Sequence, residues 1–143
     1  MDIVDIISKE PPSSILVEAM RLREGQLSFN EMQATYTTDD IIKVSLKETM
    51  VRQRALDLWF AVLTDDGRLL FVTELGFSVT PSAFLTFVPE DKTSHSVFNF
   101  TVPQGLTEHF TLFAIFNNPG DGIEDLNHSL RSNIAQVSIE IVR

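Results

Sequence analysis

Apolar and polar residues alternate in short runs from about residue 26 to the end of the chain. Ile42, Val44 and Leu46 alternate with polar neighbours, and the same period of two continues through residues 56–62. This period is typical of a half-buried β-strand, because successive side chains point to opposite faces of a sheet. Turn residues separate the runs at the spacing of a sandwich or barrel. The pattern therefore predicts an all-β domain.

A tight turn joins two of these runs. Residues 56–62 lead into Thr64-Asp65-Asp66-Gly67, and residues 68–73 return as the partner strand. The Asp-Gly step supplies the positive φ that a tight hairpin needs. The returning strand is predicted to place Leu69 and Phe71 on one face and Leu70 and Val72 on the other. We expect both strands to be central in their sheet.

The remaining runs predict shorter elements and one buried strand. Short strands are expected at residues 77–79 and within 84–88, a longer one at 97–102, and the last at 137–141. The run from Glu108 to Phe116 is almost continuously apolar, which is typical of a strand covered on both faces. Residues 117–132 are polar and rich in Asn, Asp and Gly, and they predict a long loop.

The first 25 residues do not share the sandwich pattern. Ile3, Ile6 and Ile7 stand at helical spacing, and Ser14 is a possible cap for a helix that ends before Gly25. The same segment also alternates as a strand, so helix and strand both remain open. We divide the chain into an N-terminal arm or linker, 1–25, and a β-sandwich domain, 26–143. The arm is expected to dock on its own domain or on a neighbour.

Composition narrows the class of partner. The formal charge is −9, from 20 acidic and 11 basic residues, which opposes binding to nucleic acid. No apolar run approaches the roughly 20 residues of a membrane span, and residues 1–10 lack the features of a signal peptide. The chain has no cysteine, so disulfides and thiolate chemistry are excluded. We therefore predict no nucleic acid, no membrane span and no cofactor, with calcium as the possible exception.

Several motifs recur in a fixed order along the second part of the chain. They are Asp57-Leu58-Trp59-Phe60-Ala61-Val62, Asp66-Gly67-Arg68-Leu69-Leu70-Phe71, Val102-Pro103 with Gly105, Phe110-Thr111-Leu112-Phe113-Ala114, Asn118-Pro119-Gly120 and Ser132-Asn133-Ile134-Ala135. In this order residues 40–143 resemble an immunoglobulin-like module of bacterial secreted and surface proteins. The sequence has Glu108-His109-Phe110 where such modules usually have Gly-Thr-Tyr. The resemblance implies an antiparallel immunoglobulin-like β-sandwich and an extracellular or cell-surface location, and it carries over no functional residue.

The loop from Asn117 to Asn127 holds the best candidate metal ligands. Its oxygen-bearing side chains are of the kind that calcium prefers. We predict Asp121, Glu124, Asp125 and Asn127 as possible calcium ligands. The spacing does not match an EF-hand, and the same residue types serve ordinary turns.

Catalytic chemistry has little support in the sequence. His95, His109 and His128 have no local serine or carboxylate arrangement, and we expect them on the surface or in loops. The acid pairs Asp39-Asp40, Asp65-Asp66 and Glu90-Asp91 lie at predicted turns. Adjacent acids on a turn point apart, which does not suit paired acid and base work. We therefore predict no enzyme activity.

The aromatic balance favours packing over sugar binding. The chain has 11 phenylalanines, one tyrosine and one tryptophan. Sugar platforms mostly use Trp and Tyr, whose polar ends bond the ligand, whereas Phe serves apolar packing. Trp59 lies on the face opposite Leu58 and Phe60, and on a central strand it is expected in a core.

These observations predict a non-catalytic structural or assembly protein, such as a subunit of a surface filament or an accessory module of an extracellular complex. Its partner is expected to be a protein or a second copy, engaged through the N-terminal arm. A donated segment from that arm is able to complete a neighbouring sheet. The alternative is a carbohydrate- or calcium-binding module that uses the loops around Asp65 and Asp121.

Overall fold

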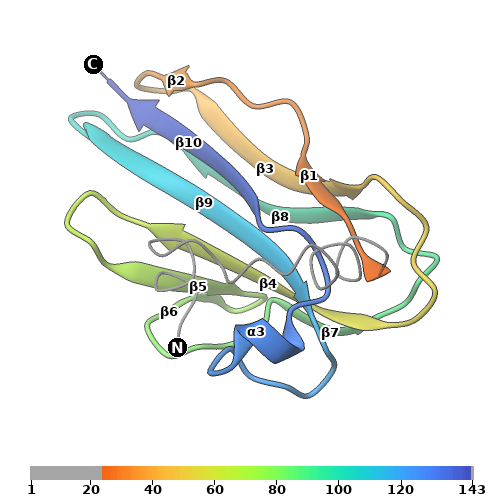
Figure 1. The fold of residues 1–143 in the computed structure, drawn as a ribbon. Coiled ribbons are helices and arrows are strands. Elements are labelled where there is room, and N and C mark those ends of the chain that lie inside the picture. Colours follow the sequence, from red (N-terminus) through yellow and green to blue (C-terminus); the bar gives the residue numbers. More distant parts are fainter. Residues whose placement is uncertain (1–23, 143) are drawn as a thin grey trace.

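The described part of the chain, residues 24–142 of a computed structural model, is all-β apart from one helical turn (Figure 1). The strands are β1 Leu27–Phe29, β2 Thr35–Tyr36, β3 Ile41–Glu48, β4 Leu56–Leu63, β5 Leu69–Thr73, β6 Gly76–Ser78, β7 Leu85–Val88, β8 Ser94–Thr101, β9 Glu108–Asn117 and β10 Ala135–Ile141. The single turn of helix is α3, Leu126–Ser129. Both the helical and the extended hypothesis for the arm fall on residues outside the described part.

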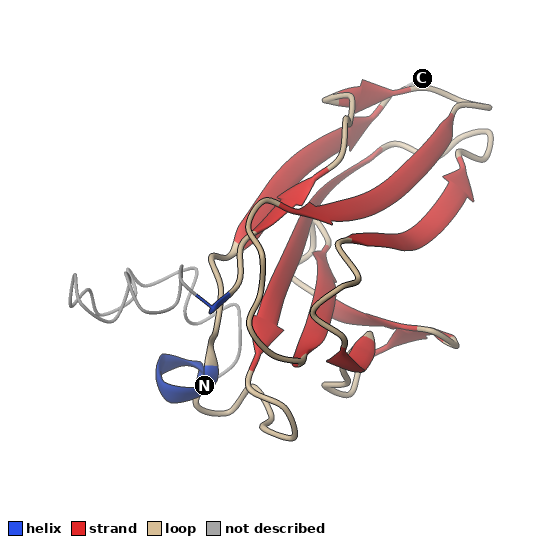
Figure 2. Cartoon of the chain, turned by 90° about the vertical axis from the view of Figure 1, so that its right-hand side faces the viewer, coloured by secondary structure: helices blue, strands red, loops and turns tan. Residues whose placement is uncertain are grey.

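Two sheets make up the fold. The smaller has the order β1-β3-β8, and the larger has the order β2-β10-β9-β4-β5-β6, with β7 paired to β4. Neighbouring strands are antiparallel, except that β2 runs parallel to the end of β10 through Thr35 and Tyr36. The all-β sandwich prediction is confirmed. Figure 2 shows the strands from the side, with the helical turn at the lower left.

The predicted hairpin forms as expected. Ala61, Val62 and Leu63 of β4 pair with β5, and β4 and β5 are both internal to the larger sheet. The amide of Thr64 donates to the carbonyl oxygen of Arg68 at 2.9 Å, and Gly67 has a φ of +85°. Glycine adopts this left-handed conformation without the steric cost that a Cβ brings. The Asp-Gly signal thus located the turn correctly.

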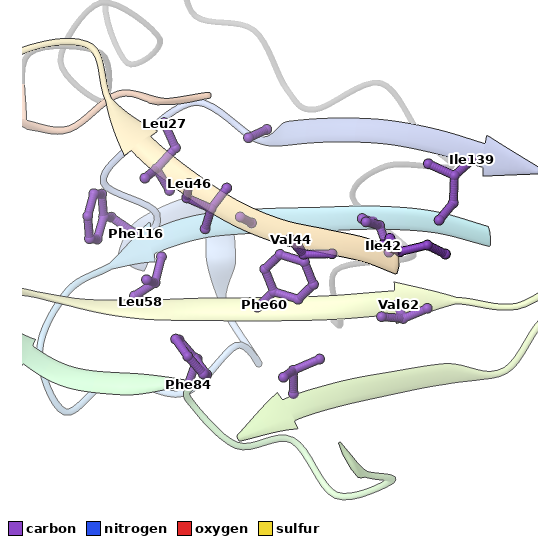
Figure 3. Close-up of a cluster of buried hydrophobic side chains, with 14 of the residues drawn as sticks. Leu27, Ile42, Val44, Leu46, Leu58, Phe60, Val62, Phe84, Phe116 and Ile139 are labelled. Atoms are coloured by element: carbon purple, nitrogen blue, oxygen red, sulfur yellow. The ribbon is translucent and has the colours of Figure 1, made fainter. Parts of the chain in front are cut away.

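The main core lies between the two sheets (Figure 3). Ile42, Val44 and Leu46 of β3 point toward Leu58 and Phe60 of β4, and each is at most 2% exposed. Burying a side chain of this size contributes about 1.5–3 kcal/mol of transfer free energy. The alternation along β3 therefore explains its placement, with Lys43 and Lys47 on the exposed face.

A second core covers the opposite face of the larger sheet. It contains Trp59, Ala61, Phe71, Phe113, Ile115, Ile123, Leu126 and Leu130. The last three come from the connection between β9 and β10, which folds back over the sheet and includes α3. The prediction that β9 is covered on both faces is therefore confirmed.

The connection itself differs from its prediction. Residues 117–132 were expected to form a long polar loop, but Asn117 belongs to β9 and Ile123, Leu126 and Leu130 are at most 3% exposed. Their spacing of three and four residues matches one face of a helical turn. The Asn and Gly residues around them masked this short apolar pattern.

Candidate functional site

A buried polar cluster lies at one end of the smaller sheet. The side chains of Glu48 and Arg52 are both 0% exposed, and Arg52 Nε donates to Glu48 Oε1 at 2.5 Å. His95 Nε2 lies 2.8 Å from Glu48 Oε2, and the His95 side chain is also fully buried. Arg52 Cζ lies 4.5 Å from the centroid of the Phe116 ring.

Arg52 uses its donors to join two connections of the chain. Its Nη1 donates to the carbonyl oxygens of Arg54 and Val88, at 3.0 and 2.9 Å. Its Nη2 donates to Glu48 Oε2 at 3.1 Å and to the Pro89 carbonyl oxygen at 2.7 Å. The buried guanidinium donates to the backbone carbonyl oxygens of Arg54, Val88 and Pro89. This geometry suits a structural clamp that holds these segments together.

The expectation of a surface or loop position is wrong for His95. It lies on β8, 1% exposed, with its ring edge-to-face against Phe116 at a centroid distance of 6.2 Å. Strand β8 pairs with β3, which brings His95 opposite Leu46 and close to Glu48. The polar residues around position 95 could not predict this contact, because its partner, Glu48, lies 47 residues earlier in the chain.

The other two histidines are exposed, as expected. His128 Nδ1 lies 2.7 Å from Asp125 Oδ2, and their side chains are 84% and 65% exposed. His109 begins β9, where its backbone amide donates to Asp65 Oδ2 at 3.0 Å. Neither ring is enclosed in a way that sets up acid and base work.

The acid pairs lie at turns, in agreement with their predicted positions. Asp66 accepts hydrogen bonds from the Thr64 hydroxyl and from Arg68 Nε, the latter at 3.0 Å. The Thr64 hydrogen bond, followed by that of Arg68, lowers the pKa of the exposed Asp66 carboxyl. The turn is thereby stabilised by ionised Asp66.

The structure spreads the predicted calcium ligands along an exposed loop. Asp121 Oδ2 accepts from Asn118 Nδ2 at 3.0 Å, Asp125 bonds His128, and Glu124 is exposed. The side chain of Asn127 lies outside the described residues. Within residues 24–142, no three His, Asp or Glu side chains come together in a metal-binding group. Calcium binding at this loop stays a prediction.

Asp57, a buried acid, accepts a hydrogen bond from the backbone of the same loop. Asp57 of β4 is 3% exposed, and its Oδ1 accepts from the amide of Phe87 at 2.8 Å. Its Oδ2 accepts from the amide of Gly120 at 3.0 Å. Asp57 thus ties β7 to the connection after β9, and sequence reasoning missed this role.

Trp59 is 7% exposed and packs edge-to-face on Phe71, with the ring centroids 5.9 Å apart. Its expected core position is confirmed, on the face covered by the connection before β10. It is therefore not placed as a surface platform for a sugar ring.

One open side of the sandwich is lined by phenylalanines. The rings of Phe77 on β6 and Phe98 on β8 meet edge-to-face at a centroid distance of 5.9 Å, although the two strands belong to different sheets. Phe77 is 59% exposed and Phe100 38%. Behind them lies a cavity of about 210 Å³ between the sheets.

The same side presents the edges of both sheets. Strand β8 pairs with β3 alone, and β6 pairs with β5 alone, among the described residues. The eight residues of β8, Ser-His-Ser-Val-Phe-Asn-Phe-Thr, include no Lys, Arg, Asp or Glu. Ser45 pairs with Ser96 and Val44 with Phe98, so Val97 forms a bulge, and Phe98 to Thr101 stay in regular register.

Comparisons with known proteins place the chain in no family. No family model matches it, and no curated protein matches it. A structure titled "AvmM Catalyzes Macrocyclization in Alchivemycin A Biosynthesis" is similar over 85% of this chain and 90% of its own, with a TM-score of 0.37 and 14% identity. A Pseudomonas fluorescens alkylpurine DNA glycosylase, AlkC bound to DNA with an abasic site analogue, is similar over 85% of this chain. That match spans 30% of the glycosylase, with a TM-score of 0.36 and 8% identity. No helix in the described residues is long and apolar enough to cross a membrane.

Proposed function

We propose that this chain is a non-catalytic assembly domain of immunoglobulin-like type, in which the open edge of β8 accepts the apolar N-terminal arm of a second copy. The observation that carries the proposal is the eight-residue strand β8, which lies at a sheet edge among the described residues and has no Lys, Arg, Asp or Glu. Natural proteins usually protect such an edge with charges, proline or a covering segment, because its unpaired backbone groups template pairing with another chain.

The bulge at Val97 protects only part of this edge. A bulge disrupts the ladder locally and increases its twist. The regular stretch from Phe98 to Thr101 keeps its outward backbone groups in strand geometry. Exposed Phe100 beside it adds apolar area for a side chain from the incoming strand.

The arm has the composition of such a strand. It carries Ile3, Ile6, Ile7, Leu16 and Leu22 within a segment that the sandwich core, residues 27–141, does not include. Its length of more than 20 residues exceeds what is needed to span an eight-residue strand. The location that fits an assembly of this kind is a filament or complex at the cell surface.

Sedimentation of the full chain tests the proposal, and the structure defines a clean deletion. The cut belongs before Glu24, because Glu24 pairs with Arg54 and Arg131, and Gly25 packs closely on Phe116. We expect the full chain to form oligomers and the chain that begins at Glu24 to be a monomer. A full chain that sediments as a monomer at all concentrations would overturn the proposal.

A substitution on the edge of β8 provides a second test. Asn99→Lys places a charge on the exposed edge of β8, and charge on an edge opposes strand addition. Gln136→Lys is the matched control, since Gln136 is exposed on β10 of the larger sheet, where it pairs with Phe113 of β9. We expect Asn99→Lys to dissociate the oligomer and Gln136→Lys to leave it intact. Equal behaviour of the two variants would show that the β8 edge is not the contact.

A further inference from the structure

We propose that the cavity between the sheets is a binding site for a free small molecule with a hydrocarbon ring or chain. Its volume is about 210 Å³. An engineered apolar cavity of about 150 Å³ stays dry and binds benzene, so this one accepts a larger group, of about eight to ten carbon atoms. The ligand is thus a medium-length alkyl chain or a compact apolar ring system.

The walls define the chemical class. Side chains from seven strands line the cavity, and all belong to Ile, Val, Leu or Phe, with Ile42, Val62, Leu70, Phe98 and Phe110 among them. A polar group placed there would lose its bonds to water without a partner. A hydrocarbon has no hydrogen bonds to water to lose, and it gains dispersion contacts with every wall. The buried part of the ligand is therefore wholly apolar.

The size of the cavity is itself informative. Protein interiors pack as densely as organic crystals, and voids larger than a water molecule are few. Phe60, Leu58 and Leu46 of the main core are fully buried. The cavity lies at the end of the sandwich where Ile42, Phe110 and Ile141 meet. An apolar cavity of this size beside a buried core has the form of a site.

Phe77 is the movable wall. It lies on β6, a strand of three residues that, within residues 24–142, pairs with β5 alone, and it is 59% exposed. Its contact with Phe98 closes the gap between the two sheets. Short edge elements with few buried contacts open at low free-energy cost. Movement of β6 therefore admits the ligand without unfolding the sandwich.

Binding is tested on the full chain with a homologous series of hexanol, octanol, decanol and dodecanol, followed by methyl NMR. We expect saturable binding that tightens up to octanol or decanol and gains nothing at dodecanol, with shifts at Ile42, Val62 and Leu70. An affinity that rises steadily with chain length, or shifts confined to exposed Leu75 and Val79, would mean surface partitioning and would overturn the proposal. Absence of shifts in the full chain would overturn it as well, including the case in which the arm fills the cavity.

Two neighbouring substitutions separate the cavity from general effects. Leu70→Phe adds volume at a half-buried wall of the cavity, whereas Leu69→Phe adds the same volume on the opposite face of β5. We expect Leu70→Phe to weaken octanol binding about tenfold or more and Leu69→Phe to leave it unchanged. The far-ultraviolet circular dichroism of both variants reports whether they fold. Folded variants with equal affinity for octanol would overturn the proposal.

Discussion

Arg52 and Glu48 form a fully buried ion pair, in which Nε of the arginine lies 2.5 Å from Oε1 of the glutamate. The arginine at the same time donates to the carbonyl oxygens of Val88, the last residue of β7, and of Pro89, the first residue after it. One side chain thus fixes two segments that are more than 30 residues apart. The contribution of Arg52 to the free energy of unfolding is therefore set by the buried groups that lose their partner when it is replaced.

Arg52→Met is expected to lower the free energy of unfolding by about 3–5 kcal/mol, because buried Glu48 then loses its guanidinium partner and keeps only His95. Urea denaturation measures the change. Arg54→Met is the control, since Arg54 pairs with Glu24 while 46% exposed, and loss of an exposed pair costs about 0–1 kcal/mol. If the two variants lose the same stability, the clamp at Arg52 has no special role.

Leu126→Ala tests whether the connection before β10 is a true part of the core. Leu126 is fully buried in the same cluster as Trp59, and truncation of a buried leucine costs about 2–5 kcal/mol. Leu75→Ala, at a fully exposed position, is expected to change the free energy of unfolding by about 0.5 kcal/mol or less. A loss below 1 kcal/mol for Leu126→Ala would indicate that the connection is a detachable loop.

Gly25→Ala tests how closely the chain packs where it enters the sandwich. A Cβ at Gly25 would lie 2.9 Å from Phe116 Cδ2 and 3.3 Å from the carbonyl oxygen of Arg131. Overpacking of this kind costs about 1–3 kcal/mol, measured by thermal or urea unfolding. At Gly122 the three atoms nearest to an added Cβ belong to the flexible side chain of Glu124, so Gly122→Ala is expected to cost less than Gly25→Ala. Equal stability of the two variants would contradict the packing at Gly25.

The turn at Asp66 predicts a pH dependence with a defined sign. Hydrogen bonds from Thr64 and Arg68 lower the pKa of Asp66 in the folded protein. Its contribution to stability is therefore present at neutral pH and is lost as the pH falls through the lowered folded pKa. We expect Asp66→Asn to lower the melting temperature slightly at neutral pH and to match the parent once Asp66 is protonated. A difference that is the same at both pH values would show that ionised Asp66 does not stabilise the turn.

The strands were predictable because their signals are local. A period of two in β3, the Asp-Gly turn between β4 and β5, and the continuous apolar run of β9 each lie within about ten residues. Burial on one or both faces follows directly from such a run. The sequence pattern therefore identified the sandwich core and the two-sided cover of β9.

The polar cluster and the cavity were not predictable in this way. Glu48 meets His95 only because β3 pairs with β8, and no local pattern names that partner. The cavity depends on how far two sheets diverge at one end, which is a property of strand twist and side-chain volume together. The segment that covers the second face of the larger sheet did have a predictive pattern. Its apolar residues stand at helical spacing among residues that otherwise resemble a loop; they are Ile123, Leu126 and Leu130.

The pairing of β3 with β8 also bears on how the protein folds. Partners in this ladder are 47 to 60 residues apart in the chain, so β3 has no β8 until most of the domain has been synthesised. Ladders between distant segments form slowly, because the loop must close before the contacts reward it. During that interval the apolar face of β3 and the uncharged β8 are both open to other chains. Folding of this domain is therefore expected to be sensitive to protein concentration and to chaperones during synthesis.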